Sequence, residues 1–282
     1  MINPSEMIPQ KKLDNGQWWN LPWSLVDGCT RVSTGCDNCW LTAVNERFGR
    51  VPEKVTPRED RLTIPLKRRK PTVYTIWSDL FHEAVPDSFI DKAFAVMALC
   101  PQHLFIVLTK RPERMAEYYA SVAERTPCII GEVMVAISGS SGPGYEWPLP
   151  NLWIYASAEN QKQFDLRWPY LARCPAVVRG MSLSPLLGPI DLAGGRDGGL
   201  EIYMGDLDGP VTTNIHHIIT ECESGPKRRP CDDAWVKSIA DQCTAAGVPW
   251  WNKQMSIGGK VSHDMSSEGG WPEWARRREF PT

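Results

Sequence analysis

A loop with three cysteines constrains this chain more than any other stretch of its sequence. Cys29, Cys36 and Cys39 lie within eleven residues, and two residues separate the last pair, a spacing that lets neighbouring thiolates turn onto one metal centre. Three thiolates on a [4Fe–4S] cluster would leave one iron open for chemistry. A zinc site would need a fourth close ligand, and none of the five histidines lies in the first eighty residues. The loop therefore predicts a cluster; a zinc knuckle completed by a distant ligand, or a chance grouping, is the alternative.

The composition of the chain indicates a cytoplasmic protein without a membrane span. Its 282 residues suit one α/β barrel or two small domains. The nine cysteines are an odd number and the polar N-terminus does not resemble a signal peptide, which argues against a secreted disulfide framework. Cys100 and Cys243 lie in apolar helical patterns and are expected to be buried. No apolar run approaches the roughly 20 residues that a membrane span needs. The net charge is −2, so contact with nucleic acid would require a local basic patch.

Short apolar runs alternate with segments of helical period along most of the chain, and polar residues follow most of the runs. Strands are expected at 25–26, 73–77, 104–108, 152–156, 176–183, 215–220 and 248–251. Helices are expected at 41–48, at 87–99, from Pro112, near Asn160 and at 232–246. This alternation predicts an α/β fold with a parallel sheet and right-handed crossovers, whose site lies at the carboxyl ends of the strands.

The sequence outside these elements divides into two ends and two insertions. Residues 1–17 are polar and lack a period, so we expect an arm or a frayed terminus. The barrel is expected over residues 18–256, with insertions near 121–151 and 193–214, the second as a small hairpin. Residues 257–282 are rich in glycine, serine and charge, which is typical of a tail.

The segment that leads into the cysteine loop resembles the opening of a known family. Residues 20–29, Asn-Leu-Pro-Trp-Ser-Leu-Val-Asp-Gly-Cys, and the loop after them are similar to a phage-associated family of radical-SAM-like proteins with an unusual three-cysteine spacing. Further matches keep the family's order, cover roughly residues 18–256 and lie at 78–83, 108–114, 157–161, 185–190, 223–226 and 253–254. The usual radical SAM motif has three residues between its first two cysteines, and this chain has six.

The resemblance implies a fold, two cofactors and a type of reaction. The fold is a partial or complete (β/α) barrel of the radical SAM type, with parallel strands and the cluster loop after the first strand. A [4Fe–4S] cluster on the three cysteines would bind S-adenosylmethionine, and an external donor such as a flavodoxin or ferredoxin would supply one electron. The resulting 5′-deoxyadenosyl radical would take a hydrogen atom from a substrate, which is then rearranged or modified. The phage setting implies a nucleic-acid or nucleotide substrate in the cytoplasm of an infected bacterium, for example an amino acid-decorated thymine in hypermodified DNA.

Polar residues at the expected strand ends are the candidates for binding the cofactor and the substrate. The candidate cofactor ligands are Ser78, Asp79, Thr109, Ser157, Glu159, Asn160 and Ser182. The candidate catalytic residues are Lys110, Glu221 and Glu223, because a lysine could hold a carboxylate or phosphate and two carboxylates could bind an amine or perturb each other's pKa. Simpler roles stay open: Asp79 could cap a turn, Lys110 could be a surface lysine, and Asn160 could start a helix.

Two basic runs and a group of tryptophans are the features that would recognise nucleic acid. Residues 67–70 and 227–229 could contact phosphates or could be solvated faces. Trp18, Trp19 and Trp23 precede the cysteine loop, where they could shield a cluster from water or stack on a nucleobase, although core packing is the ordinary role of tryptophan. A rival hypothesis from another class is a zinc-stabilised nucleic-acid-binding module without catalysis.

Overall fold

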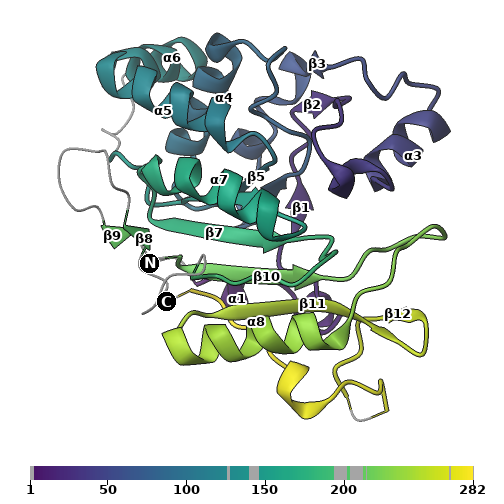
Figure 1. Ribbon diagram of the computed structural model, residues 1–282. Helices are drawn as coiled ribbons and strands as arrows, with labels where there is room; N and C mark the ends of the chain where they lie inside the picture. The colour runs from purple at the N-terminus through teal and green to yellow at the C-terminus, as the bar shows by residue number, and fades with distance from the viewer. Residues whose placement is uncertain are drawn as a thin grey trace.

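The protein is built on one eight-stranded sheet that curls into a half-barrel (Figure 1). The computed structural model describes residues 3–125, 128–139, 146–193, 202–203, 212–213, 215–266 and 268–281. The strand order is β1 (Leu21–Pro22), β4 (Val73–Ile76), β5 (Leu104–Thr109), β6 (Leu152–Ser157), β7 (Val178–Leu183), β10 (His217–Glu221), β11 (Trp250–Ile257) and β12 (Lys260–Ser262). Neighbours from β1 to β11 are parallel, and the edge strand β12 is antiparallel to β11. The sequence therefore predicts the mostly parallel α/β fold correctly.

Helices cover the outer face of the sheet (Figure 1). They are α4 (Asp87–Leu99), α5 (Pro112–Arg125), α6 (Cys128–Ser138), α7 (Gln161–Arg173) and α8 (Asp233–Ala246). Pro112 is the first residue of α5, and Asn160 caps α7 by accepting a hydrogen bond from the Gln163 N–H. Gly247 ends α8 in the left-handed region, with φ 65°. Within the described ranges, no helix is both long and apolar enough to cross a membrane.

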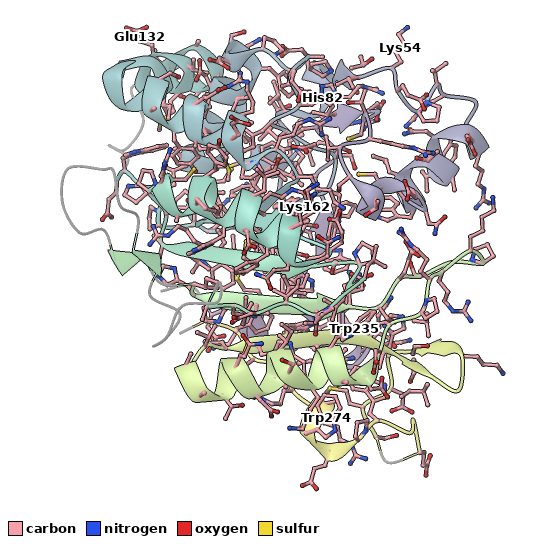
Figure 2. All side chains as sticks on the ribbon, viewed as in Figure 1. Lys54, His82, Glu132, Lys162, Trp235 and Trp274 are labelled. Carbon is pink, nitrogen blue, oxygen red and sulfur yellow. The ribbon has the colours of Figure 1, made fainter. Side chains whose placement is uncertain are left out.

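The strands are buried on both faces, which is why their sequences are continuous apolar runs rather than alternating patterns. Every residue of β4, β5 and β6 is buried. On the outer face, side chains such as Phe94, Ile154 and Trp168 form the main core between sheet and helices. Trp235 of α8 and Trp274 of the short helix η4 (Glu273–Ala275) pack against this core (Figure 2). The core fixes the strands and so the positions of the side chains at their ends.

The N-terminal segment packs on the inner face of the sheet, near the amino ends of the strands. It contains the short helices α1 (Pro4–Met7) and α2 (Gln10–Asp14) and continues to Trp18. Ile8 and Trp18 are buried against inner-face residues, and the ring centroid of Trp18 lies 5.4 Å from that of Tyr155. Residues 3–17 are therefore not a free arm, because tertiary contacts hold two helices too short to be stable alone.

The C-terminal segment closes the same end of the inner face. Arg278 donates hydrogen bonds from Nη1 to the carbonyls of Leu13, at 2.8 Å, and Asp14, at 2.7 Å. The ring of Phe280 lies 4.7 Å from that of Trp251, centroid to centroid. The expected tail over 257–282 thus contains a strand, a short helix and a segment that joins the two ends of the described chain.

Other elements differ from their expected positions. The first strand of the sheet is β1, whose Leu21 lies opposite Tyr74. Of the strand predicted at 25–26, only Val26 belongs to a strand, β2 (Val26–Asp27), which pairs antiparallel with β3 (Thr56–Pro57) outside the main sheet. The shorter elements nearby are the 3-10 turns η1 (Thr34–Cys36), η2 (Glu59–Arg61) and η3 (Pro65–Lys67), and α3 (Trp40–Arg47).

The two predicted insertions have different outcomes. The region near 121–151 contains the end of α5 and all of α6, which packs against α4, so most of its first half is helical. In the region near 193–214, β8 (Ile202–Tyr203) and β9 (Thr212–Thr213) pair antiparallel, as a small hairpin requires. Residues 194–201, 204–211 and 214 of that region, and 126–127 and 140–145 of the first, lie outside the described residues.

Candidate functional site

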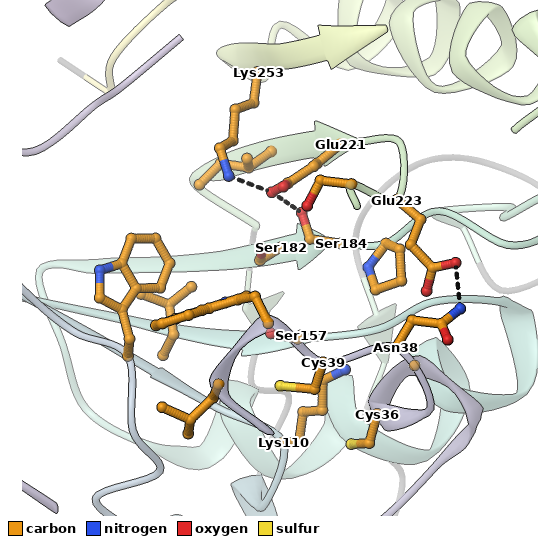
Figure 3. A pocket seen from close by; sticks show the side chains of 18 of the residues that line it. Cys36, Asn38, Cys39, Lys110, Ser157, Ser182, Ser184, Glu221, Glu223 and Lys253 are labelled. Atoms are coloured by element: carbon orange, nitrogen blue, oxygen red, sulfur yellow. Dashed lines mark hydrogen bonds and ion pairs between the residues drawn. The ribbon is translucent and has the colours of Figure 1, made fainter. Parts of the chain in front are cut away.

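A cavity of about 540 Å³ opens at the carboxyl ends of the parallel strands (Figure 3). In Figure 1 this is the side toward which the arrowheads of β7, β10 and β11 point, and α3 lies on it. Cys29, Cys36 and Cys39 all line the cavity, together with side chains from the ends of β5, β6, β7, β10 and β11. The predicted metal ligands are therefore brought together, at the edge of the sheet where α/β barrels carry their active sites.

Backbone hydrogen bonds shape the cysteine loop itself. The N–H of Cys29 donates to Pro52 O at 2.8 Å, and the N–H of Cys36 donates to Ser33 O at 2.9 Å, which begins the 3-10 turn η1. Gly28 has φ 78°, and a Cβ there would lie 2.2 Å from Lys54 O, so this position requires glycine. The loop is thus folded against the segment that follows α3.

The first limb of the loop is held by Arg111, which follows β5. Its guanidinium is 5% exposed and forms an ion pair with Asp79, with Nη1 3.0 Å from Oδ2. Nη2 donates to the carbonyl and the hydroxyl of Thr30, at 3.1 and 2.7 Å. Nη1 also lies 3.7 Å from the sulfur of Cys29. The hydroxyl of Thr30 is bonded in addition to Nε2 of His82, at 2.8 Å, so the limb is fixed from two strand ends.

The middle of the loop is held by Glu159, which follows β6 and is fully buried. Its Oε1 accepts a hydrogen bond from the Gly35 N–H at 3.1 Å, and its Oε2 is paired with Arg167 of α7 at 3.1 Å. Burial raises the pKa of this carboxyl, but the hydrogen bond from Ser33 and the nearby positive charges outweigh that effect, so the pKa lies below its ordinary value. A Cβ at Gly35 would lie 2.9 Å from Glu159, which means that the loop and the carboxylate are in close contact.

The last limb is held by Glu223, which follows β10. Its Oε2 accepts hydrogen bonds from the side-chain amide of Asn38 at 3.0 Å and from Nε of Arg229 at 2.9 Å (Figure 3 shows the first). Arg229 also reaches Asp37, at 3.4 Å. Glu223 lines the cavity, as a residue that contacts the substrate would, and its carboxylate also bonds to Asn38, between Cys36 and Cys39.

Other polar side chains in the cavity are less involved in holding the cysteine loop. Lys110 lines the cavity, and its positive charge lies near Glu159 and helps to lower the pKa of that carboxyl. Glu221 forms an ion pair with Lys253 at 2.7 Å and accepts a hydrogen bond from Ser184 at 3.2 Å, on the far side of the cavity from Cys36 (Figure 3). Ser157 and Ser182 also line the cavity. All of these groups line the cavity, where they would meet a bound molecule.

Tryptophans and apolar strand residues form the other wall of the cavity. Trp18, Trp19 and Trp77 line it with Leu108 and Ile219. The rings of Trp19 and Trp77 are 4.7 Å apart, centroid to centroid, and the ammonium of Lys253 lies 5.7 Å from the Trp19 ring. This wall separates the polar groups from the packed end of the inner face.

Several predicted site residues do not face the cavity. Ser78, Glu159 and Asn160 are absent from its lining, and the Asn160 side chain caps α7, which is the simpler role left open for it. Asp79 and Thr109 line the cavity, but the carboxylate of Asp79 already accepts from the Thr109 hydroxyl at 2.6 Å. Trp23 is buried in the core and donates to Arg61 O at 2.9 Å.

Several residues that help to hold the loop or shape the cavity were not identified from the sequence. Arg111, Arg167, Asn38 and Arg229 are the partners of the strand-end carboxylates, and Trp77 shapes the wall. Only one signal pointed to them: Arg111 lies in a segment that resembles the family, directly after a buried strand. Nothing in the sequence indicates that an arginine in a helix, such as Arg167, is buried.

The two basic runs that were predicted to contact phosphates lie in different parts of the fold, and the first is far from the cavity. Residues 67–70 precede β4, and the Arg68 carbonyl accepts a hydrogen bond from Gln102, which precedes β5, at 3.4 Å. This run is therefore at the amino edge of the sheet, opposite the cavity. In the run 227–229, Arg229 is paired with Glu223 and Arg228 is bonded to the carbonyls of Gly225 and Gly259, so Lys227 is the member left to contact a phosphate.

The donor atoms in the described part of the chain do not form a site for a single metal ion. No group of three or more His, Cys, Asp or Glu side chains there converges closely enough to hold one. The three cysteine sulfurs face one cavity from separate points of an eleven-residue loop. A mononuclear zinc site draws four donors to about 2.0–2.3 Å from one ion, whereas a cluster binds each thiolate through a different iron. Three thiolates are a donor set that a [4Fe–4S] cluster with one open iron can take up.

The fold and the cavity define this protein as an α/β half-barrel with three cysteines at the carboxyl edge of its sheet. The chain belongs to the family described as "Protein of unknown function (DUF5131)", whose model matches residues 15–270. The match includes the cysteine loop and every strand of the half-barrel. Neither a curated protein nor a solved structure matches the chain.

Proposed function

We propose that this protein is a radical SAM enzyme whose Cys29, Cys36 and Cys39 bind a [4Fe–4S] cluster and whose half-barrel is of the radical SAM type. The observation that carries the proposal is the position of the three thiols. They follow the first strand of a parallel half-barrel and line one cavity at the carboxyl ends of its strands. The donor type supports a cluster, because three thiolates leave one iron of a cubane open, whereas the zinc of the rival hypothesis needs a fourth ligand.

The residues of the loop have one shared task, which is to present three sulfurs in a fixed arrangement. Arg111, Glu159 and Glu223 hold its three parts from three different strand ends. Such outer partners keep metal ligands in position and are needed for tight binding. With S-adenosylmethionine bound, the cluster would supply one electron to cleave a carbon–sulfur bond and give a 5′-deoxyadenosyl radical.

The cavity beside the thiols has the groups that a charged cofactor requires. S-adenosylmethionine carries an ammonium, a carboxylate and ribose hydroxyls. Lys110 is placed to hold a carboxylate, and the hydroxyls of Ser157 and Ser182 are placed to bond to polar groups of the cofactor. The wall of Trp19 and Trp77 would exclude water from the reacting atoms. The predicted cofactor site therefore narrows to these three polar side chains, with Asp79 and Thr109 as support.

The substrate that we propose is a nucleobase, in DNA or as a nucleotide, in the cytoplasm of an infected bacterium. Aromatic rings in the cavity wall offer a surface on which a base can stack, and a base in a duplex would have to be flipped to reach it. Glu221 and Lys253 lie across the cavity from Cys36 and would contact polar groups on that base (Figure 3). The partner for electron transfer would be a flavodoxin or ferredoxin.

Anaerobic purification tests the metal, and incubation with S-adenosylmethionine and a reductant tests the reaction class. We expect brown protein with about four irons and four sulfides per chain. We also expect 5′-deoxyadenosine to form without knowledge of the substrate. Colourless protein with one zinc after anaerobic reconstitution would support the zinc module and end the proposal. Iron without 5′-deoxyadenosine would leave a cluster protein of another class.

A further inference from the structure

Every N–H group of Arg111 has an acceptor, and one of them is a sulfur of the proposed cluster site. Nε donates to the carboxylate of Glu83, at 2.9 and 3.0 Å. Nη2 donates twice to Thr30, and Nη1 donates to Asp79 and toward the sulfur of Cys29, 3.7 Å away. A planar fork of five donors in fixed directions is specific to arginine. The orientation of the Arg111 side chain is therefore fixed, and the guanidinium cannot turn away from the sulfur without breaking other hydrogen bonds.

This contact distinguishes Cys29 from the other two cysteines. In the part of the chain that the structure describes, no side-chain donor is bonded to the sulfur of Cys36 or Cys39. The guanidinium beside Cys29 is also buried, at 5% exposure, so solvent screens its charge very little. One of the three proposed ligands thus has a buried cation in contact with its sulfur.

We propose that Arg111 is a positioning residue that fixes Cys29 for cluster binding and that raises the affinity of the bound cluster for an electron. The inference rests on the proposed function, because it requires a cluster on Cys29. Reduction of the cluster by the external donor adds one negative charge, which spreads onto the ligand sulfurs. A cation that donates a hydrogen bond to one of those sulfurs stabilises the reduced form more than the oxidised form.

The carboxylates around Arg111 strengthen this reasoning. Asp79 and Glu83 both pair with its guanidinium. If the guanidinium is removed, these carboxylates remain and their charge opposes the added electron. Loss of Arg111 should therefore lower the reduction potential for two reasons. The cation beside the sulfur is lost, and the carboxylates of Asp79 and Glu83 are no longer neutralised.

The test is a redox titration of the reconstituted full-length protein, followed by electron paramagnetic resonance, with iron content measured on each sample. Arg111→Gln should bind less iron and should lower the one-electron equilibrium constant for reduction about tenfold, a fall of about 59 mV. Arg114→Gln is the matched control, since Arg114 lies three residues further along, in α5, and pairs with Asp87 instead. Its potential and iron content should equal those of the wild type.

A second variant separates positioning from charge. Thr30→Val removes the hydroxyl that Arg111 and His82 bond, but keeps the cation beside the sulfur. It should lower iron content while the loaded fraction keeps the wild-type potential. A merely structural role for Arg111 would give the same pattern in both variants, with iron lost and the potential unchanged, and that result would overturn the inference.

Two further results of these experiments are possible, and each has a defined interpretation. If Arg111→Gln binds no iron, Arg111→Lys is titrated against Arg114→Lys, and a lower potential in the first supports the inference while an equal one overturns it. If the wild type itself binds no cluster, the proposed function and the inference fail together. A wild-type cluster whose potential does not respond to Arg111 removes the inference alone.

Discussion

The inner face of the half-barrel has two ends that are built from the same strands and differ in almost every other respect. At the amino ends, Trp18, Tyr155 and Trp251 pack with the N-terminal and C-terminal segments into a closed apolar cluster. At the carboxyl ends, the same strands finish in hydroxyl and charged groups around a cavity of about 540 Å³. The first end is filled by the chain itself, whereas the second has a cavity lined by a loop that residues after three strands hold in place.

This difference leads us to expect that stability and binding at the cavity depend on different ends of the sheet. The closed end needs only apolar surface and a few hydrogen bonds, such as those of Arg278. The open end contains buried charges at Arg111, Glu159 and Arg167, which are costly unless each is paired. Changes at the closed end should therefore alter unfolding, and changes at the open end should alter metal binding.

The largest effect that we expect is the loss of iron when a cysteine of the loop is replaced. Cys29→Ala, Cys36→Ala or Cys39→Ala should reduce the iron content from about four per chain to near zero, because each removes one of three protein ligands. Cys100→Ala and Cys243→Ala are the controls, since both residues are buried in the outer core as the sequence predicts. The controls should keep their iron and lose about 1 kcal/mol of stability. Iron loss in a control would show that the ligand assignment is wrong.

At the closed end, Arg278→Ala should lower the free energy of unfolding by about 4 kcal/mol, because several carbonyls lose their donor. Arg278 bonds to the carbonyls of Leu13, Asp14, Asn252, Lys253 and His263. Chemical denaturation of the metal-free protein measures the effect. Iron content of the folded variant should stay at the wild-type level, and a loss of iron equal to that of a cysteine variant would erase the distinction between the two ends.

Acid should weaken the closed end through His217. The imidazole is neutral, because Nδ1 accepts from the Tyr155 hydroxyl at 2.8 Å and Nε2 donates to Glu279 O at 2.9 Å. Burial lowers the pKa of His217 from 6.5 to about 4. The unfolded chain therefore binds a proton at higher pH than the folded protein does, so stability is lost as pH falls from about 6.5 to about 4, by about 3 kcal/mol in total.

Thermal unfolding of the wild type and of His217→Gln between pH 7 and pH 4 tests this point. The wild type should lose stability more steeply than the variant over that interval, so that the gap between their melting temperatures narrows in acid. Parallel curves would mean that folding does not lower the pKa of His217.

The smallest expected effect concerns the basic run at 67–70. Because these residues precede β4, at the edge opposite the cavity, Lys67→Ala, Arg69→Ala and Lys70→Ala together should leave DNA binding unchanged. Arg68 is kept because it donates to Thr72 at 2.6 Å. Binding of single-stranded DNA at two salt concentrations gives both the affinity and the number of phosphates contacted. A weaker salt dependence in the triple variant would place DNA at the amino edge and away from the cysteines.

The sequence predicts the strands of the half-barrel well because burial on both faces leaves a direct mark. Leu104–Thr109 and Leu152–Ser157 are continuous apolar runs followed by polar residues, and both are strands. The N-terminal segment could not be predicted in the same way. Its helices span four and five residues, too few to show a period, and they exist because Ile8 and Trp18 are buried by strands far along the sequence.

For the site, the sequence was enough to predict that the cysteine loop and the strand-end residues lie together. It was not enough to predict which partner each carboxylate binds. Position after a strand correctly placed Glu221, Lys110 and Ser182 beside the cavity. The same rule could not tell Glu223 from Glu221, although the first binds Asn38 and Arg229 while the second binds Lys253. Asn38 lies 185 residues from Glu223 and Lys253 lies 32 residues from Glu221, and spacing in the sequence carries no record of such pairs.

The bond between Arg278 and Leu13 also has a consequence for how the protein is made. The two residues are 265 positions apart, so the segment around Leu13 leaves the ribosome long before the arginine that secures it. Until then, the apolar side chains of Ile8 and Trp18 have no complete site, and a nascent chain with such surfaces exposed is prone to aggregate. Loss of contacts near residue 278 should therefore reduce the yield of newly made protein more than it reduces the lifetime of protein that has already folded.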